Sequence, residues 1–301
     1  MHTPLLSGVY AAAVTPCNQA GEFDPPGLHL LLDFLASRGC HGSLLLGTTG
    51  EGPSFSASER LAIWQAAADW RNSHPGFRLI AGTGTPSLSE TIELTQTAFG
   101  LGFEAVVVLP PYFIRNASQE GLFDWYAALI ERAVPNDRTL LGYHIPAVSG
   151  VALPLSLLQR LSEAFGSKFG GLKDSSGSLE SAQDYIRGLP GKAVLVGSDK
   201  LLSAGLAAGA AGCITALANL NSAEARAIYD AHLAGQETAA MQAALDLRRA
   251  ALEAAPPAPA YLKAMLHSLH GLPSWAVKPP LRDFTPAQVD AAAQALNELQ
   301  R

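Results

Sequence analysis

The sequence predicts an α/β protein, a (β/α)8 TIM barrel with a C-terminal helical extension. Short apolar runs recur about every thirty residues, and a helical pattern follows each of them. The runs are rich in Val, Ile and Leu without regular alternation, which is typical of parallel strands buried on both faces. Eight such units fit a barrel of roughly 220 residues. We therefore assign residues 1–222 to the barrel and residues 223–301 to a helical extension packed on it.

The predicted strands follow one another in the order that a barrel requires. An open doubly wound sheet is the alternative, and it would usually carry a glycine-rich phosphate loop after its first strand. Here the first strand ends in Val14-Thr15-Pro16-Cys17, which contains no such loop. The predicted strands are Gly8–Pro16, Gly42–Gly47, Arg78–Gly84, Ala105–Pro110, Thr139–Pro146, Phe169–Ser175, Ala193–Ser198 and Gly212–Asn219.

Start signals mark several of the helices between these strands. Segments 56–59 and 87–90 have the Ser-x-x-Glu spacing of a capping box, in which the serine and the glutamate satisfy free N–H groups. Asp24 precedes two prolines that suit a first helical turn. Strand patterns stop after residue 222, and the Ala-rich helices that follow are interrupted at two proline-rich segments, 255–259 and 278–280.

Composition and charge exclude several classes of protein. The 301 residues carry a net charge of −6 and no run of Lys or Arg, which argues against nucleic-acid binding. No apolar stretch of about twenty residues occurs, so no membrane span is expected. The N-terminus lacks the pattern of a signal peptide. Cys17, Cys40 and Cys213 are far apart and are expected to be buried thiols of a reducing compartment, which favours a cytoplasmic location.

The predicted site is organised around the segment Phe169–Gly177, a short apolar strand that ends in Lys173 and a polar turn. Phe169, Leu172 and two glycines surround Lys173, so its amine is expected to meet little water. Burial disfavours the ammonium form. A neutral amine can add to a ketone, and the resulting Schiff base withdraws electrons. The alternative is that Lys173 only ends the strand and pairs with Asp174.

The turn after the second strand is a candidate carboxylate site. In Gly47-Thr48-Thr49-Gly50-Glu51, two hydroxyls and several free backbone N–H groups lie in one tight turn. Such a group of donors suits a substrate carboxylate. The alternative is a plain turn with Glu51 in a surface salt bridge.

The fifth strand ends in Tyr143-His144-Ile145-Pro146. A tyrosine at a strand end can transfer a proton to or from a reacting atom if its hydroxyl is polarised. The alternative for Tyr143 is an aromatic cap on the barrel core. His144 should point to the other side of the strand, and we predict that it forms a structural hydrogen bond behind the barrel.

The ends of the last three strands supply candidate groups for the remainder of a substrate. Each of them can instead serve as a cap or turn residue. No cluster of His, Cys, Asp or Glu has the spacing of a metal site, and Schiff-base chemistry needs no metal, so neither a metal nor a cofactor is expected. The candidates are Ser175, Asp199, Lys200, Ile214 and Thr215.

Three motifs in order resemble the dihydrodipicolinate synthase / N-acetylneuraminate lyase family of class I, pyruvate-handling aldolases. They are Gly-Thr-Thr-Gly-Glu after the second strand, Tyr-X-X-Pro after the fifth and Gly-Leu-Lys-Asp-Ser-Ser-Gly after the sixth. The resemblance covers essentially the whole chain. It implies that Lys173 forms a Schiff base with a 2-oxo acid, that Tyr143 transfers the proton, and that Thr48 and Thr49 hold the carboxylate. It also implies a homotetramer built as a dimer of dimers.

The sequence departs from the synthases of this family at two places. There Pro-Tyr-Tyr follows the fourth strand and the second tyrosine reaches the neighbouring subunit, whereas this chain has Phe113. The synthases also bind the aldehyde's carboxylate with an arginine after Tyr-X-X-Pro, where this chain has Val148. Arg115 is another arginine that could reach the site.

The sequence also departs from the sialate lyases. They have Asp-Glu after the seventh strand, where this chain has Asp199-Lys200, and a serine where this chain has Ala216. Sialic acid is therefore not the expected substrate.

The leading prediction is a Schiff-base aldolase or lyase that acts on a 2-keto-3-deoxy sugar acid, with pyruvate and an aldehyde as its partners. The first alternative is the 4-hydroxy-tetrahydrodipicolinate synthase of lysine biosynthesis. A dehydratase that uses the same imine chemistry is a second, and a non-catalytic barrel is a third. The presence of Lys173, Tyr143, Thr48 and Thr49 together argues against the non-catalytic barrel.

Overall fold

The computed structural model describes residues 6–253 and 258–299 and confirms the predicted TIM barrel. All strand pairs are parallel, and β8 closes the barrel by pairing with β1. The observed strands lie inside the predicted ranges, which also included loop residues. They are β1 (Gly8–Ala12), β2 (Gly42–Leu45), β3 (Arg78–Gly82), β4 (Ala105–Val108), β5 (Thr139–His144), β6 (Phe169–Asp174), β7 (Ala193–Val196) and β8 (Gly212–Thr215).

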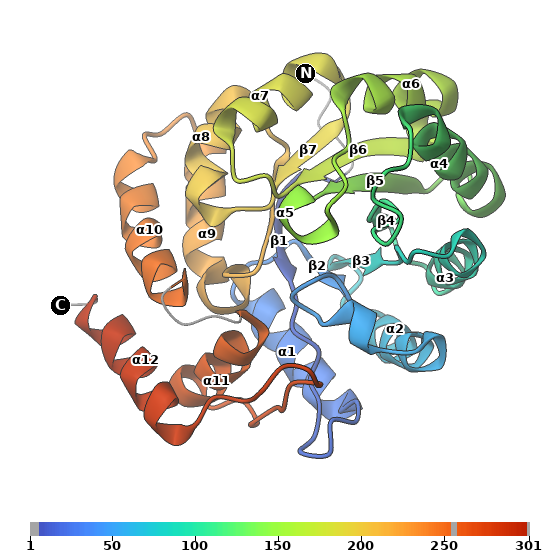
Figure 1. Cartoon of the computed structure of the whole chain (residues 1–301). Helices are drawn as coiled ribbons and strands as arrows, with labels where there is room; N and C mark the ends of the chain where they lie inside the picture. Colours follow the sequence, from blue (N-terminus) through green and yellow to red (C-terminus); the bar gives the residue numbers. More distant parts are fainter. Residues whose placement is uncertain (1–5, 254–257, 300–301) are drawn as a thin grey trace.

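Helices surround the barrel and extend beyond it (Figure 1). Short 3-10 helices occur at Gly52–Ser54, Gly166–Lys168 and Asp199–Leu201. The helices are α1 (Pro25–Ser37), α2 (Ala57–Arg71), α3 (Leu88–Gly100), α4 (Gln119–Ala133), α5 (Pro146–Ser149), α6 (Leu155–Phe165), α7 (Leu179–Gly188), α8 (Leu202–Ala208), α9 (Ala218–Leu233), α10 (Ala239–Glu253), α11 (Ala258–His270) and α12 (Pro286–Glu298).

All three predicted helix starts are confirmed, and one of the two predicted capping boxes is complete. Asp24 caps α1 by accepting from the backbone N–H of Gly27, and the capping box of Ser56 and Glu59 is complete in α2. At α3, Ser87 caps the helix, but its own N–H donates to Thr85 rather than to a glutamate, so the box is only half formed.

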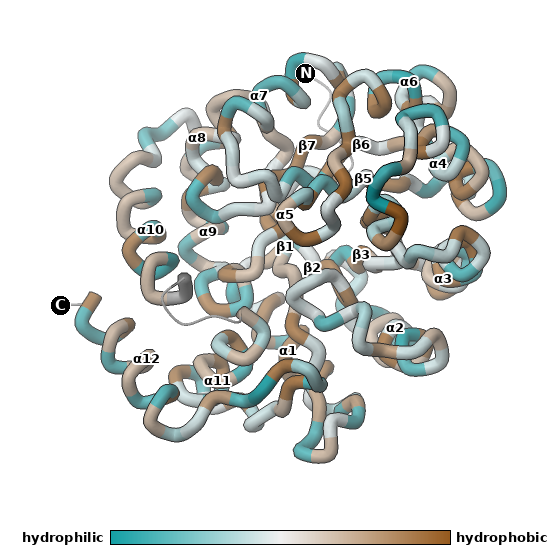
Figure 2. The backbone as a smooth tube through the Cα atoms, in the orientation of Figure 1, coloured by the Kyte–Doolittle hydropathy of each residue, from teal (hydrophilic) through white to brown (hydrophobic). Residues whose placement is uncertain are grey.

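Two apolar layers hold the barrel together. Alternate strand residues, such as Leu141, Leu195 and Ile214, fill the barrel interior with Tyr143. Their neighbours in the strands, such as Cys213, pack with the surrounding helices. This division follows from the two-residue repeat of a strand. Figure 2 shows hydrophilic segments on outer turns of helices such as α6 and α12. Because apolar side chains occupy both faces of the strands, functional side chains are expected at the strand ends.

Three helices, α10, α11 and α12, follow α9 and lie beside one another (Figure 1). α9 spans the predicted boundary at residue 222, with a non-helical backbone at Asn221. The division of the chain at that boundary stays a prediction. The proline-rich break at 255–259 falls largely outside the described residues. Across residues 6–253 and 258–299, no helix has both the length and the apolar character to span a membrane.

Candidate active site

Lys173, Tyr143 and Thr48 meet at the carboxyl end of the barrel. Lys173 on β6 pairs in register with Tyr143 on β5, so the two side chains point to the same side of the sheet. Lys173 is 3% exposed, and its Nζ lies 4.2 Å from the centre of the Tyr143 ring. The Tyr143 hydroxyl lies 3.4 Å from Thr48 Oγ1. The structure therefore brings together three groups that the sequence placed after three different strands.

The surroundings of Tyr143 make its hydroxyl more acidic than that of a free tyrosine. Burial on its own opposes ionisation, but the positive charge of Lys173 and the hydrogen-bonding groups of Thr48, Lys173 and Ser175 outweigh it and lower the pKa of Tyr143. A hydroxyl with a lowered pKa, directly beside an amine, can accept and return a proton during a reaction.

The alternative pairing of Lys173 with Asp174 is not observed. Asp174 Oδ1 accepts from the backbone N–H of Ser176 at 2.9 Å, and its Oδ2 is buried without a hydrogen-bond partner in the described part of the chain. His144 behaves as predicted, because its Nδ1 accepts from the backbone N–H of Leu153 at 3.0 Å.

The turn that carries Thr48 and Thr49 has an unusual backbone. Leu46 and Glu51 both have positive φ, at 57° and 56°, a region that costs energy for residues other than glycine. Gly52 cannot be replaced easily, because a Cβ there would lie 2.1 Å from the carbonyl oxygen of Leu46. Strain of this kind persists only where surrounding contacts enforce it.

A buried ion pair supplies those contacts, and sequence reasoning missed it. Lys263 of α11 donates from Nζ to Glu51 Oε1 at 2.6 Å and to the carbonyl of Ala276 at 2.7 Å. Both side chains of the pair are 1% exposed. The alternative that Glu51 forms a surface salt bridge is therefore wrong. A lone lysine within an apolar helical stretch was the signal that could have found this pair.

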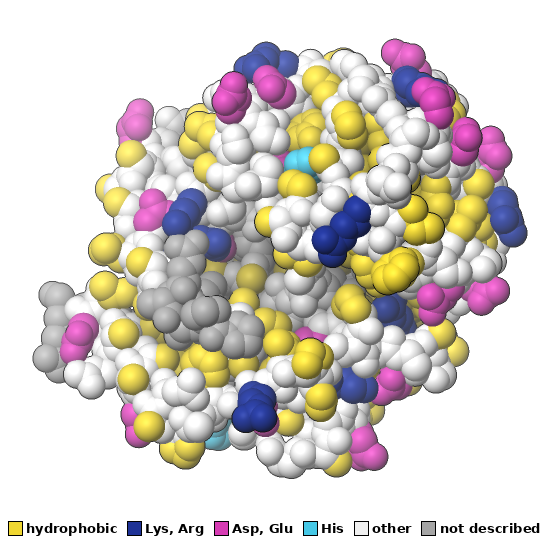
Figure 3. All heavy atoms as spheres, viewed as in Figure 1, with side chains coloured by type: hydrophobic (Ala, Val, Ile, Leu, Met, Phe, Trp, Pro, Cys, Tyr) yellow, Lys and Arg dark blue, Asp and Glu magenta, His cyan; other side chains and the backbone are white. Residues whose placement is uncertain are grey.

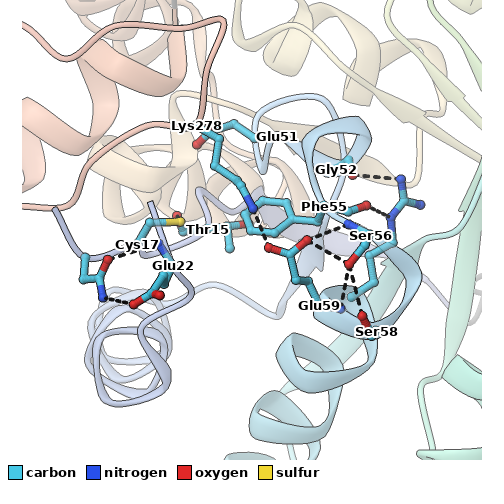
Figure 4. Close-up of polar contacts among 12 residues, drawn as sticks. Thr15, Cys17, Glu22, Glu51, Gly52, Phe55, Ser56, Ser58, Glu59 and Lys278 are labelled. Carbon is cyan, nitrogen blue, oxygen red and sulfur yellow. Dashed lines mark hydrogen bonds and ion pairs between the residues drawn. The ribbon is translucent and has the colours of Figure 1, made fainter. Parts of the chain in front are cut away.

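Lys278 ties the same turn to the segment that follows α11. Its backbone N–H donates to Glu51 Oε2 at 2.7 Å. Its side chain lies 4.3 Å from the centre of the Phe55 ring and pairs with Glu59. Figure 4 shows this side chain reaching from Glu51 to Glu59. The C-terminal helices therefore hold the turn that carries the candidate carboxylate donors.

A cavity of about 520 Å³ lies against Thr48 and Tyr143, and most of its wall is apolar. In the space-filling view, hydrophobic side chains gather around a hollow on this face (Figure 3). Of the predicted residues, Gly47 also lines the cavity. Sequence reasoning missed several other lining residues, among them Arg60, Tyr112, Pro280 and Leu281.

The residues predicted to hold the remainder of the substrate do not line this cavity. Asp199 is buried and accepts from Arg249 of α10 at 2.8 Å. Burial raises the pKa of Asp199, although Arg249 opposes the shift. Ile214 belongs to the barrel interior, and Thr215 is buried at the end of β8. Lys200 is exposed and Ser175 half-buried. Their role in substrate binding stays a prediction.

The two departures from the synthase pattern lie on the surface beside the cavity. Val148 of α5 lines the cavity and is 58% exposed, whereas Phe113 in the β4–α4 loop is 85% exposed. Arg115 is exposed and packs on Gly150, where a Cβ would lie 2.7 Å from its Cδ. Arg115 is thus near α5 but outside the cavity wall.

Comparison with known sequences finds relatives along the whole chain. The model of the dihydrodipicolinate synthetase family matches residues 5–299. An uncharacterized DapA-like lyase from Chloroflexus aurantiacus is 38% identical over 97% of this chain and 96% of its own length. A 4-hydroxy-tetrahydrodipicolinate synthase from Corynebacterium urealyticum is 33% identical over 96% of this chain and 94% of its own length.

Solved structures with the same fold cover both chains almost completely. A prophage protein of the dihydrodipicolinic acid synthase family from E. coli K12, solved in complex with pyruvate, has a TM-score of 0.91 and 26% identity over 98% of this chain and 99% of its own. A chloride-inhibited dihydrodipicolinate synthase from Acinetobacter baumannii, also complexed with pyruvate, has a TM-score of 0.89 and 26% identity over the same shares. The resemblance is thereby confirmed, and the chain is a lyase that belongs to the dihydrodipicolinate synthetase family.

Proposed function

We propose that this enzyme is a class I aldolase in which Lys173 forms a Schiff base with a 2-oxo acid and pyruvate is one reaction partner. The observation that carries the proposal is the contact between the buried Lys173 amine and Tyr143, whose hydroxyl also faces Thr48. Relatives solved with pyruvate support the same partner.

The proposed reaction begins at the substrate's C2 carbonyl. The amine of Lys173 in its neutral form adds to it, and the hydroxyl formed at C2 takes a proton from Tyr143 and leaves as water, which gives a protonated imine and ionised Tyr143. In the cleavage direction, ionised Tyr143 takes the proton of the C4 hydroxyl. The C3–C4 bond then breaks, its electron pair moves into the imine to give an enamine, and the aldehyde leaves. Protonation of the enamine at C3 and addition of water release pyruvate and the free amine.

The turn from Gly47 to Thr49 would hold the carboxylate of the 2-oxo acid. Thr48 lines the cavity, and Thr49 lies beside it in the same turn. Backbone N–H groups and hydroxyls at a tight turn bind anions well. Lys263 and Glu51 would act indirectly, because their ion pair holds the turn in place without touching the substrate.

A 2-keto-3-deoxy sugar acid remains the proposed substrate class, and the synthase reaction is the second candidate. The synthase pattern needs a cation near position 148 and a hydroxyl at position 113. Val148 and Phe113 supply neither. Loss of a charge-assisted hydrogen bond costs roughly 1.5–3 kcal/mol, which corresponds to about one to two powers of ten in rate.

The two candidates are separated by comparing kcat/KM on one preparation. We expect measurable cleavage or condensation with a hydroxylated sugar acid, and weak condensation of pyruvate with aspartate semialdehyde. A dehydratase would give a product of unchanged carbon number, which mass spectrometry of the product detects. Efficient turnover of aspartate semialdehyde with none of any sugar acid would reverse the ranking.

We further propose a cytoplasmic homotetramer built as a dimer of dimers, following the family pattern. Phe113 and Ile114 support association, because these neighbouring apolar side chains are 85% and 62% exposed in the single chain. Burial of such side chains in an interface is favourable.

A further inference from the structure

His144 holds together the two ends of the loop that carries α5, residues 145–153, which we call the α5 loop. The loop leaves β5 directly after His144 and returns to it at Leu153, whose backbone N–H donates to His144 Nδ1 at 3.0 Å. Tyr185 of α7 secures the same point, because its hydroxyl donates to the carbonyl of Leu153 at 2.8 Å.

The α5 loop forms part of the wall of the candidate active site. Val148 and Ser149 line the same cavity as Tyr143. The hydroxyl of Ser149 donates to the carbonyl of Val151 at 2.9 Å, which links α5 to the segment that leads to Leu153. A change at the far end of the loop would therefore reach the cavity wall.

The bond to Leu153 requires the neutral form of His144. In a neutral imidazole only one nitrogen carries a proton, and the other nitrogen accepts a hydrogen bond. Because Nδ1 accepts from Leu153, the proton of neutral His144 lies on Nε2. Protonation of His144 would place a second proton on Nδ1, so that two N–H groups would face each other and the bond to Leu153 would be lost.

Asp174 offers protonated His144 another partner. The two residues are register partners on β5 and β6, so their side chains lie on the same face of the sheet, opposite to Tyr143 and Lys173. Asp174 is 2% exposed, and its Oδ2 has no hydrogen-bond partner among the residues that the structure describes. A buried carboxylate oxygen without a partner is unfavourable, and a positive charge on the neighbouring imidazole would compensate it.

The charge of His144 itself changes close to neutral pH. Two ionisable residues in the described part of the chain face it, Asp174 of β6 and Tyr185 of α7, whose ring centre lies 5.5 Å from that of the imidazole. Burial raises the pKa of Tyr185 to about 12, so its hydroxyl stays protonated, and the α5 loop contains no ionisable residue. Burial lowers the pKa of His144, although the charge of Asp174 opposes the shift. His144 is therefore neutral at pH 7 and gains its proton in mildly acidic solution.

We propose that His144 is a positioning residue, which holds the α5 loop against the cavity in its neutral form and, when protonated, releases the loop and turns to Asp174. The enzyme therefore binds its 2-oxo acid more weakly in mildly acidic solution. This inference rests on the proposed Schiff-base function for its binding readout, and it adds a dependence on pH to the same site. His144 acts through the loop and does not touch the substrate.

The first test follows the α5 loop directly and does not depend on catalysis. NMR titration of the imidazole measures the protonation of His144, and hydrogen exchange of the Leu153 amide, corrected for the intrinsic effect of pH, measures opening of the loop. We expect protection of this amide to fall by about 2–10-fold or more as His144 gains its proton, since one hydrogen bond is lost. Protection that stays constant through the titration overturns the inference.

A variant of Asp174 tests the second partner. In Asp174→Asn the carboxylate charge that favours the imidazolium is gone, so the pKa of His144 should fall below its value in the wild type. The same NMR titration measures this shift. A pKa of His144 that does not fall would overturn the role of Asp174 in the switch.

The second test compares pyruvate binding at about pH 8 and about pH 5.5, on either side of the ordinary pKa of histidine. Cyanoborohydride traps the imine, and the readout is the pyruvate concentration that gives half-maximal labelling. His144→Asn keeps an oxygen that can accept from Leu153 but cannot be protonated. His41→Asn is the matched control, because His41 Nδ1 also accepts from a backbone N–H at 3.0 Å and burial also lowers its pKa, but His41 directly precedes β2, at the opposite end of the barrel.

All three proteins should agree at the higher pH, which shows that the variants are folded at the site. At the lower pH, the wild type and His41→Asn should need about 2–10-fold more pyruvate than His144→Asn. A wild type that matches His144→Asn at both pH values, or a His41→Asn variant that behaves like His144→Asn, overturns the inference. If none of the proteins forms a pyruvate adduct, the proposed function fails; in that case, or if His144→Asn does not fold, exchange of the Leu153 amide in the wild type decides the inference.

Discussion

Replacing Tyr143 by phenylalanine is expected to lower kcat by about 10²–10⁴-fold, the usual contribution of a positioned acid or base. The substitution removes only the hydroxyl that faces Thr48 at 3.4 Å, and it leaves the ring against Lys173. Imine formation should suffer less than carbon–carbon bond cleavage, because the amine remains in place. Steady-state kinetics and the rate of borohydride trapping measure the two steps separately.

Tyr126→Phe is the matched control for this prediction. Tyr126 is also a buried tyrosine with one hydrogen bond, from its hydroxyl to the carbonyl of Val108 at 3.0 Å, but it lies among the core residues between barrel and helices. Loss of this hydrogen bond should reduce the stability of the protein slightly and leave kcat unchanged. Near-normal turnover by Tyr143→Phe would assign Tyr143 to packing rather than to proton transfer.

Replacing Lys263 by methionine is expected to cost about 3–5 kcal/mol of unfolding free energy, as is typical when one partner of a buried ion pair is removed. The Glu51 carboxylate would remain buried and, among the residues that the structure describes, would keep only the backbone N–H of Lys278 as a donor. Because Glu51 belongs to the turn of Thr48, activity should fall as well. Urea unfolding gives the free energy, and pyruvate labelling reports on the site.

Two further variants separate charge from packing. The double variant Lys263→Met with Glu51→Gln should recover part of the lost stability, because the uncompensated buried charge is then gone. Arg187→Met disrupts an ion pair with Asp184 in which the side chains are 67% and 54% exposed, and it should remain close to the wild type. If Lys263→Met lowers the unfolding free energy no more than Arg187→Met does, the buried pair does not stabilise the fold.

The barrel and the centre of its site were predictable because they depend on local patterns. Apolar runs define the strands, and parallel strands in a barrel bring their carboxyl ends to one face. The meeting of Lys173 with Tyr143 and Thr48 follows from that geometry alone.

Contacts between distant segments were not predictable in the same way. Lys263 and Glu51 are 212 residues apart, and only the packing of α11 against the turn reveals their pairing. Asp199 was predicted to face a substrate. In the structure its carboxylate pairs with Arg249, which lies 50 residues further along the chain. Arg60 has the sequence context of an ordinary helix residue, and its place in the cavity wall depends on how α2 follows the strained turn.

The most direct test of the proposed chemistry is reduction of the protein with borohydride in the presence of pyruvate, followed by mass spectrometry of the digested chain. Borohydride reduces an imine to a stable amine, so a Schiff base is fixed at the lysine that forms it. We predict a pyruvate-derived adduct on Lys173 that is absent from Lys173→Ala. An unlabelled Lys173, or labelling of the protein that persists in Lys173→Ala, would contradict the assignment of Lys173 as the Schiff-base lysine.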